Sequence, residues 1–216
     1  MYHFTDDLNL NQHFWFDKKL IENMNWAMLP KASKSVFPVI ACHRNKRGLS
    51  FPGEQTISAL SGRTEKIVRE GIRGLAGFPN FKMNYYTTKH GRRSKRFFLK
   101  TPPFEKGRSF PFHKIIILGG NWSMLKPSAT AIYPVMRYFG YFDEPDEDVE
   151  FDDETFSGRT HDFCQAQTSL LAKYAGIARR SVFIAMDNLQ EHYLIERSDR
   201  GNELEWKVFF ATAETL

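Results

Sequence analysis

Apolar residues recur along the chain at the spacing of amphipathic helices, and short alternating stretches follow them. The pattern predicts helices over residues 54–60 and 64–75, separated by a glycine-containing turn at Ser61 and Gly62. On a helical wheel, four apolar residues of the second helix share one face: Ile67, Val68, Ile72 and Leu75. Alternation then predicts a β-hairpin whose strands cover residues 81–87 and 96–99.

The same order of elements is predicted again in the second half of the chain. Residues 164–189 read as two helices around a turn at Ala175 and Gly176, and the second of these helices covers 178–189. A second hairpin is expected with strands over 193–196 and 204–210. The pattern therefore predicts helix, turn, helix and hairpin twice.

An internal repeat supports this duplication. Residues 25–40 (NWAMLPKASKSVFPVI) and 121–136 (NWSMLKPSATAIYPVM) share six of sixteen positions without a gap. Two matched pairs stand out, Trp26 with Trp122 and Pro38 with Pro134. We expect the tryptophans to anchor the core rather than to stack on nucleic-acid bases. The prolines fall inside helical patterns, where they are expected to kink or end the helix.

These elements predict an α+β protein that is mainly helical, with small β-hairpins. The expected division is a first domain over 1–100, a semi-rigid linker over 101–113 and a second domain over 114–216. The two copies differ by an inserted stretch over 143–154, in which nine of twelve residues are acidic. This insertion is expected to be either a solvated surface loop or a mimic of DNA charge.

Two stretches carry a resemblance to a known fold. The runs KLIENMNWAMLPKASKSVFPVI and SFPGEQTISALSGRTEKIVREGIRGL resemble winged helix-turn-helix modules of phage and plasmid replication proteins and of bacterial regulators. Two such modules in tandem also resemble plasmid replication initiators. The resemblance covers most of residues 17–100 and 113–210, and it implies that the second helix of a module enters the DNA major groove.

Charge is divided unevenly between the two halves. The net charge is +5, yet residues 1–110 hold 20 basic and 8 acidic residues, whereas residues 111–216 hold 10 basic and 17 acidic ones. Nine of those seventeen acids belong to the 143–154 insertion, so the rest of the second half is close to neutral. A basic first half indicates a polyanionic partner, either nucleic acid or an anionic membrane surface.

The first half offers two basic features for DNA. Outward positions and the start of the 64–75 helix supply five candidate DNA-binding residues: Arg63, Thr64, Lys66, Arg69 and Arg73. Among them, the arginines can pair with guanine in bidentate fashion, which favours Arg69 and Arg73 as base readers. The hairpin tip adds five cations, and Gly91 permits its tight turn: Lys89, Arg92, Arg93, Lys95 and Arg96.

The second half repeats the plan with different chemistry. Its second helix begins with the candidate DNA contacts Arg179, Arg180 and Ser181, but Asp187 and Glu191 follow near the outward face. Phe183 and Ile184 have no place in the apolar stripe of this helix. We interpret this half either as a weaker DNA contact or as a protein-contact module that uses Phe183 and Ile184. A third alternative is that Phe183 packs on the neighbouring module.

Other classes of protein find little support. Cys42 and Cys164 are far apart, and His161 with Cys164 supplies only half of a zinc ligand set, so both cysteines are expected to be buried thiols. The sequence contains no phosphate-binding loop and no nucleophile motif that would indicate catalysis, and no metal or cofactor is expected. The longest aliphatic run, Ile115–Leu118, is too short to cross a bilayer, and we expect a cytoplasmic, nucleoid-associated protein.

The sequence thus predicts a non-enzymatic protein that binds double-stranded DNA, as a transcriptional regulator or as the replication initiator of a mobile element. The first module would supply most of the affinity. A second copy of the chain, or a replication or transcription protein, is the expected protein partner. The alternative is a tandem winged-helix interaction protein that does not read DNA sequence.

Overall fold

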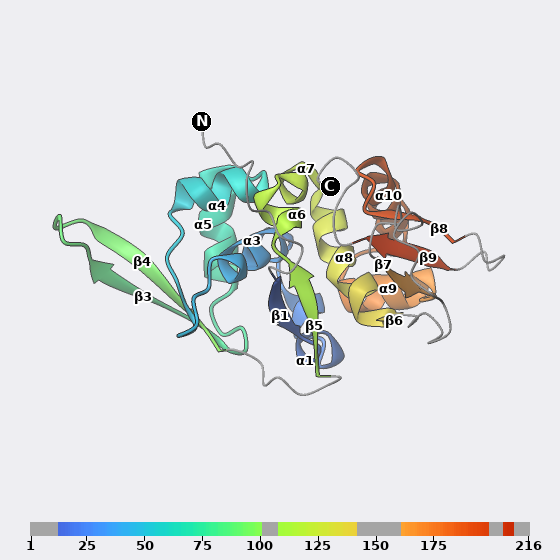
Figure 1. The fold of residues 1–216 in the computed structure, drawn as a ribbon, viewed down its shortest axis with the longest axis horizontal. Coiled ribbons are helices and arrows are strands. Elements are labelled where there is room, and N and C mark those ends of the chain that lie inside the picture. Colours follow the sequence, from blue (N-terminus) through green and yellow to red (C-terminus); the bar gives the residue numbers. More distant parts are fainter. Residues whose placement is uncertain (1–12, 101–107, 142–160, 199–204, 210–216) are drawn as a thin grey trace, which may run out of the picture.

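The computed structural model describes residues 13–100, 108–141, 161–198 and 205–209. Within these residues the chain forms ten helices and three small antiparallel sheets, which makes it the α+β protein expected from the sequence (Figure 1). The acidic insertion 143–154 and the tip of the second hairpin lie outside the described residues.

The first half runs from a central strand to a long hairpin. Its elements are β1 (His13–Asp17), α1 (Lys19–Glu22), α2 (Asn25–Met28), α3 (Lys31–Cys42), β2 (Leu49–Ser50), α4 (Glu54–Ser61), α5 (Glu65–Gly74), β3 (Phe81–Thr87) and β4 (Arg93–Leu99).

The second half repeats this order with one additional strand. Its elements are β5 (Ser109–His113), α6 (Ile115–Leu118), α7 (Asn121–Met124), α8 (Pro127–Phe139), β6 (Gly140–Tyr141), β7 (His161–Cys164), α9 (Thr168–Ala175), α10 (Arg179–Glu191), β8 (Ile195–Arg197) and β9 (Trp206–Phe209).

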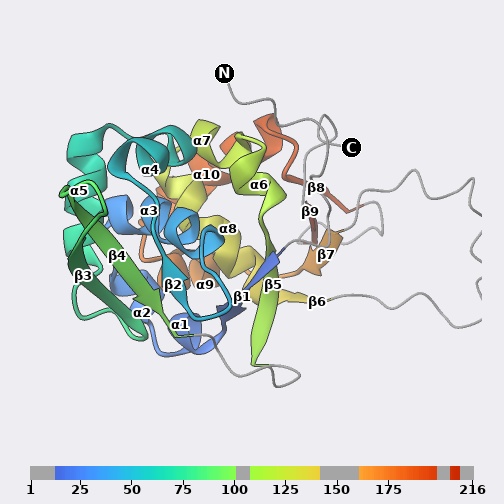
Figure 2. The ribbon, with the colours of Figure 1, turned by 60° about the vertical axis from the view of Figure 1, so that its left-hand side comes forward.

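Both helix pairs and both hairpins fall where the sequence pattern predicts them, apart from the starts of strands. The first sheet has the order β2-β4-β3, and the second contains the equivalent order β7-β9-β8 with β6 added at its edge. In Figure 2 the β3–β4 hairpin lies beside α5, with β2 along its other edge. Strand β4 begins at Arg93 rather than at residue 96, which changes where the cations of this hairpin point.

The two halves meet along strands β1 and β5. These strands pair antiparallel, and the central pair of the register joins Trp15 to Pro111, which are 96 residues apart like the two copies of the repeat. This register is what a two-fold axis through the middle of the ribbon produces. Residues 109–113, expected in the linker, are therefore a strand of the interface, because their apolar side chains Phe110 and Phe112 are buried there.

Two tryptophans cross the interface in opposite directions. The Trp26 indole N–H donates to the Ala131 carbonyl at 2.9 Å, and the Trp122 indole N–H donates to the Ser35 carbonyl at 2.8 Å. Both donors and both acceptors are related by the same shift of 96 residues. Both indoles are fully buried, which confirms the expectation that they anchor the core. One continuous core joins the two halves.

The matched prolines lie one turn after these two carbonyls. Pro38 and Pro134 lie inside helices α3 and α8, which continue past them, so the expectation that a proline ends either helix is wrong. A proline removes one backbone N–H and disturbs the carbonyls of the preceding turn. Ser35 and Ala131 each lie three residues before a proline. The indole N–H of the opposite half therefore supplies a hydrogen bond at the place where the helix is weakened.

The turns between the paired helices also fit into the opposite half. Gly62 and Gly176 both adopt positive φ, at +63° and +62°. A Cβ atom on Gly62 would lie 1.8 Å from the Ser123 carbonyl oxygen, and one on Gly176 would lie 1.9 Å from that of Ala27. Each turn thus requires glycine for two reasons. Its backbone conformation disfavours other residues, and the close approach of α7 or α2 leaves no room for a side chain.

Polar side chains at the centre of the interface are buried but hydrogen-bonded. The Lys34 ammonium donates to the carbonyls of Ala27 and Ala175, at 3.0 and 2.8 Å, and is almost fully buried. Removal from water disfavours its charged form, so the pKa of Lys34 falls to about 8. The hydroxyls of Ser35 and Thr130 share a hydrogen bond of 2.9 Å. These bonds give the interface a specific register in addition to its apolar packing.

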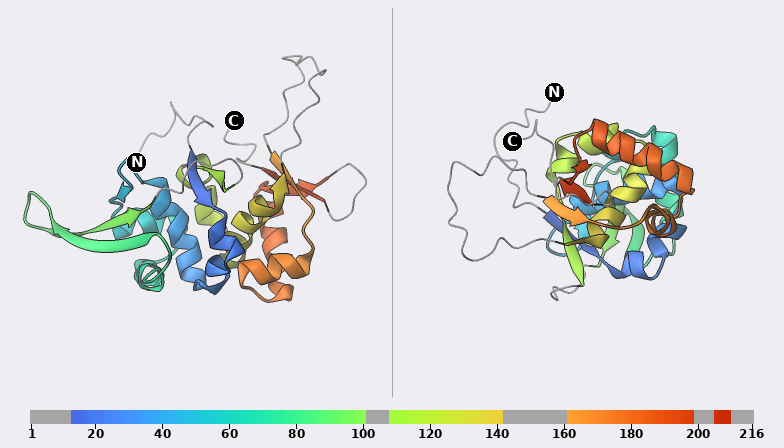
Figure 3. Two further views of the ribbon diagram at one scale, coloured as in Figure 1. Left: turned by 90° about the horizontal axis from the view of Figure 1, so that it is seen from below. Right: turned by 90° about the vertical axis from the view of Figure 1, so that its right-hand side faces the viewer.

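The pseudo-two-fold arrangement decides where the functional elements lie. The β3–β4 hairpin projects from one end of the molecule and the β8–β9 hairpin from the other (Figure 1). Helix α5 lies toward the end of the molecule that carries β3 and β4, and α10 lies toward the end that carries β8 and β9 (Figures 1 and 3). The two halves therefore form one body with the equivalent helices toward its two ends.

The close approach at Gly62 predicts a stability difference between two glycines of similar backbone conformation. Gly77 has φ +82°, and a Cβ atom added to it would have no neighbour within 4 Å, so Gly77→Ala should cost only backbone strain, about 1 kcal/mol. Gly62→Ala adds a collision with Ser123 and should cost about 3 kcal/mol or more. Chemical denaturation of both variants measures the difference. Equal losses would contradict the proposed packing of this turn against α7.

Candidate nucleic-acid interface

Helix α5 forms as its sequence predicts and presents a cationic face. The Thr64 hydroxyl accepts a hydrogen bond from the backbone N–H of Ile67 at 3.5 Å and so caps the helix, which begins with Glu65. Val68 and Ile72 are buried against α3. Gly71 permits that contact, because a Cβ there would lie 2.9 Å from the Ala32 carbonyl oxygen.

The opposite face of α5 carries Lys66, Arg69 and Arg73, all exposed, as the helical wheel predicts. Ile67 departs from that prediction, since it is 36% exposed at the edge of the apolar stripe. Among the described residues, no ion pair engages Lys66 or Arg73. Their charges are therefore available to an external anion.

The hairpin beside α5 has two faces with different partners. Its register pairs Tyr85 with Lys95 and Met83 with Phe97, and these four side chains share the face toward α5. Lys82, Asn84 and Arg96 alternate onto the opposite face. The hairpin is anchored at its base, where Phe81, Phe97 and Leu99 are buried.

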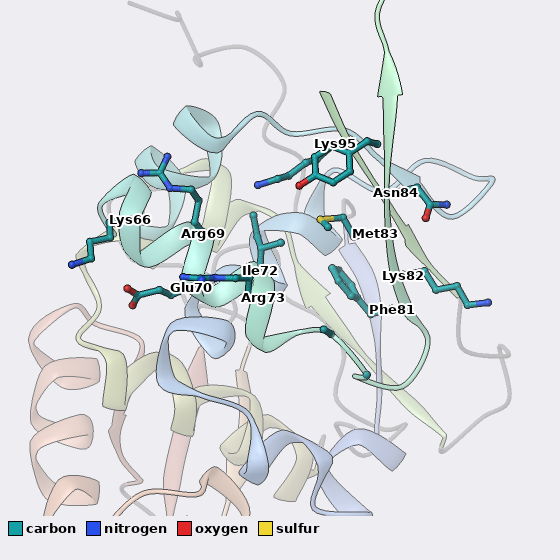
Figure 4. Close-up of a pocket in the computed structure, with 13 residues that line it drawn as sticks. Lys66, Arg69, Glu70, Ile72, Arg73, Phe81, Lys82, Met83, Asn84 and Lys95 are labelled. Carbon is teal, nitrogen blue, oxygen red and sulfur yellow. The ribbon is translucent and has the colours of Figure 1, made fainter. Parts of the chain in front are cut away.

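A groove of about 820 Å³ lies between α5 and the hairpin. We call it the basic groove and define it by four cations that line it: Lys66, Arg69, Arg73 and Lys95. Figure 4 shows Ile72, Phe81 and Met83 at its floor, whereas the side chains of Lys82 and Asn84 point away from α5. The groove thus combines an apolar floor with cationic walls, and Glu70 is an acidic residue at its rim.

One carboxylate ties the two walls of the basic groove together. Glu54, the first residue of α4, accepts from Arg69 at 3.1 Å through one oxygen and from Lys95 through the other. These two cations outweigh partial burial and hold the pKa of Glu54 below its ordinary value. Arg69 also lies 3.6 Å from Glu65. Glu54 therefore positions the hairpin relative to α5 and occupies two cations predicted to bind DNA.

The hairpin cations are spread more widely than the sequence suggests. Lys89 and Arg92 lie exposed at the tip, where Gly91 adopts φ +75° and the Thr88 hydroxyl accepts from the Arg92 N–H at 3.2 Å. Because β4 already begins at Arg93, the remaining three cations lie on the strand. Arg93 stacks on the Tyr85 ring at 4.0 Å, and Arg96 faces away from α5. The five cations thus belong to three different surfaces.

Arg63, predicted to contact DNA, forms hydrogen bonds within the folded protein. Its guanidinium donates to the Leu125 carbonyl at 2.6 Å, to the Gly62 carbonyl at 3.1 Å and to the Ser35 hydroxyl at 3.3 Å. Partial burial lowers its pKa, but an arginine remains charged. Since Leu125 belongs to the other half, Arg63 holds the two halves together. The sequence could not show this, because the Leu125 carbonyl is 62 residues away along the chain.

Helix α10 occupies the place of α5 in the second half, with different side chains on its outward face. A shift of 114 residues superposes Arg180 on Lys66, Phe183 on Arg69 and Asp187 on Arg73. Arg179 and Arg180 are exposed, and Ser181 is partly buried. Phe183 and Ile184 are 53% and 50% exposed, so Phe183 is not packed into the interface with the first half.

The contrast between the halves shows how one backbone plan can carry different chemistry. The equivalent buried positions Val68 and Val182 are apolar in both copies. Packing restricts these positions because a buried side chain has close neighbours on every side. The outward positions have no such neighbours, so their side chains are free to differ between the halves.

The structure also brings forward cations that the sequence interpretation passed over. Arg44, Lys46 and Arg47 form a loop between α3 and β2, where the Asn45 side chain accepts from the N–H groups of Arg47 and Leu49 at 2.9 and 3.1 Å. Lys46 and Arg47 are exposed. The run RNKR was a visible signal, but only the pairing of β2 with β4 places it beside the hairpin.

Three other features of the described part of the chain are its potential metal ligands, its cysteines and the apolar character of its helices. No three His, Cys, Asp or Glu side chains within it are grouped closely enough to hold a metal ion. Cys42 and Cys164 are buried, and burial raises the pKa of the Cys42 thiol to about 12. None of the described helices combines the length and the apolar character needed to cross a membrane.

Comparison of the chain with known protein families, with curated proteins and with solved structures finds no match. Interpretation of the basic groove therefore depends on its own geometry and charge.

The contrast between two arginines yields a stability prediction. Arg63→Ala removes three hydrogen bonds of a charged donor, one of them across the interface, and should lower the free energy of unfolding by about 2 kcal/mol. Arg73→Ala, on the exposed face of α5, should change it by less than about 0.5 kcal/mol. Denaturant titration of both variants gives the comparison. A stable Arg63→Ala protein would return Arg63 to the candidate DNA contacts.

Proposed function

We propose that the protein binds double-stranded DNA through two winged helix-turn-helix modules, of which the first supplies most of the affinity. The observation that carries the proposal is the basic groove, in which a helix and a hairpin present cations toward one space. The order of two helices, a tight turn and a hairpin, repeated in both halves, supports the assignment to this class of module.

In this proposal α5 lies in the major groove of the duplex. Arg73 is exposed and without an ion pair in the described residues, so it reads a guanine edge at the least cost. Lys66 and Lys95 neutralise phosphates of the strand that passes through the basic groove. Lys89 and Arg92 at the hairpin tip contact the next stretch of backbone or the minor groove.

At the centre of this surface, the Glu54 carboxylate competes with DNA for two of the cations. Arg69 and Lys95 must exchange a carboxylate for phosphate or a base edge before they contact DNA. A non-specific duplex then gains less from these two cations than their number suggests. Glu54 therefore lowers binding to arbitrary sequence and favours sites whose contacts compensate for its displacement.

The second module contributes through Arg179 and Arg180, which are exposed at the start of α10. Asp187 replaces the cation at the position of Arg73, so this contact is weaker. The biological role is that of a transcriptional regulator or a mobile-element replication initiator, acting with a second copy or with a replication or transcription protein. Copies of the bound site in an array beside an origin favour the initiator.

A second candidate function follows from α10. Phe183 and Ile184 are about half exposed on an outward helix face, a feature typical of a protein contact. In this alternative the protein is a tandem winged-helix scaffold that bridges partners without reading DNA sequence. The basic groove in the first half has no use in that role, and for this reason we favour DNA binding.

The basic groove predicts a steep and localised salt dependence. Arg69→Ala with Arg73→Ala should weaken duplex binding at least about tenfold. The slope of log affinity against log salt should fall by about 0.9 for each phosphate that the variant no longer neutralises. Fluorescence anisotropy with random and genomic duplexes at several salt concentrations measures both quantities. Arg179→Ala with Arg180→Ala is the matched control in the weaker module and should have the smaller effect.

Two outcomes separate the candidate functions. Wild-type protein that binds no duplex at low salt would contradict DNA binding and support the scaffold. A second variant combines the Arg69 and Arg73 substitutions with neutralisation of the hairpin cations. If this variant still binds duplex as well as the wild-type protein does, the basic groove is not the site.

The role of Glu54 is tested by removing its charge while keeping its shape. Glu54→Gln should strengthen binding to random duplex about fivefold and steepen its salt dependence, because two cations are released to phosphate. Glu65→Gln is the control, since Glu65 lies 3.6 Å from Arg69 and forms no ion pair with Lys95 in the described residues. Weaker random-duplex binding by a stably folded Glu54→Gln protein would instead make Glu54 a positioning residue only.

A further inference from the structure

The three-stranded sheet has a second face, directed away from α5, of which only Lys82 and Asn84 also border the basic groove. The register β2-β4-β3 places Leu49, Phe98 and Lys82 in one row across this face. Arg96 and Asn84 form the next row, and Ser94 and Tyr86 the row beyond. We call these residues, with Phe51 at the end of β2, the outer face.

Aromatic rings are exposed on the outer face although they are attached to a well-anchored sheet. Phe98 is 41% and Phe51 is 44% exposed. Phe51 meets the Tyr86 ring edge-on, with ring centroids 5.7 Å apart, so its position is fixed. Leu99 and Phe97, the neighbours of Phe98 on β4, are buried and hold the strand in place. The outer face therefore presents aromatic surface in a fixed orientation.

Cations surround these rings. Lys82 lies opposite Phe98, and Arg96 lies two residues along the same strand. The loop that carries Lys46 and Arg47 reaches the same place, because a Cβ atom added to Gly48 would lie 3.4 Å from the Phe98 ring. Among the described residues that form the rows of the outer face, none is acidic. The surface is thus complementary to a polyanion that also offers flat apolar groups.

We propose that the outer face binds single-stranded DNA, with unpaired bases stacked on Phe98 and Phe51 and with phosphates held by Lys82, Arg96 and the 46–47 loop. Exposed aromatic rings beside cations bind unpaired nucleotides in a sequence-tolerant manner, since every base has a flat face. A duplex does not satisfy this surface, because its bases are already stacked on one another. The protein then holds a duplex in the basic groove and an unpaired strand on the other side of the same hairpin.

The test uses the full-length protein and a labelled oligothymidine of about 15 nucleotides, followed by fluorescence anisotropy. Phe98→Leu keeps an apolar side chain of similar size but removes the ring, and it should weaken oligothymidine binding about tenfold. Phe98→Trp should retain binding. Lys82→Ala with Arg96→Ala should weaken it and flatten its salt dependence, which gives a second measurement that does not depend on substitution of the ring.

Controls separate this proposal from duplex binding. Phe183→Leu alters an exposed ring on α10 and should leave oligothymidine binding unchanged. Arg69→Ala with Arg73→Ala should reduce binding of duplex but not of oligothymidine, and the wild-type protein should bind both at once. Absence of oligothymidine binding by the wild-type protein overturns the proposal while leaving duplex binding intact. Equal effects of Phe98→Leu and Phe183→Leu, or full competition between the two DNAs, also overturn it.

Discussion

Two indole N–H groups that cross between the halves, each to a helix carbonyl near a proline, are the interaction on which the rest of the molecule depends. Pro38 and Pro134 weaken the hydrogen bonding of α3 and α8, and the tryptophan of the opposite half supplies a donor in the preceding turn. Both copies of the repeat thus carry a tryptophan and a proline at equivalent positions. Each half depends on the other for this hydrogen bond, because the donor and the acceptor always belong to different halves.

This reciprocal contact has consequences for α5 and the hairpin, the elements that we propose to face DNA. Because the Gly62 turn fits against α7, the start of α5 is held by the second half of the chain. Arg63 adds hydrogen bonds at the same place. The orientation of α5, and through Glu54 that of the hairpin, is therefore determined partly by residues of the acidic half. A mutation in that half can therefore change the geometry of the basic groove although the mutated residue does not line it.

Periodicity by itself determined the helices and hairpins, since the alternation of buried and exposed positions is a local property of the chain. It also identified the outward cations of α5 and the exposed Phe183 and Ile184. The repeat revealed that the fold is used twice. Local pattern was less reliable at element ends, where β4 begins at Arg93, and at residues 109–113, whose strand depends on a partner nearly a hundred residues away.

Only the tertiary structure decided which cations remain available to an external anion. Arg63 and Arg69 look alike in sequence, yet Arg63 donates to the Leu125 carbonyl across the interface, whereas Arg69 pairs with the carboxylates of Glu54 and Glu65. Charge and side-chain type are written in the sequence, whereas the partners of a charge are set by contacts between residues far apart in the chain. For the same reason, the pairing of β2 with β4 was needed to bring the 44–47 loop beside Phe98.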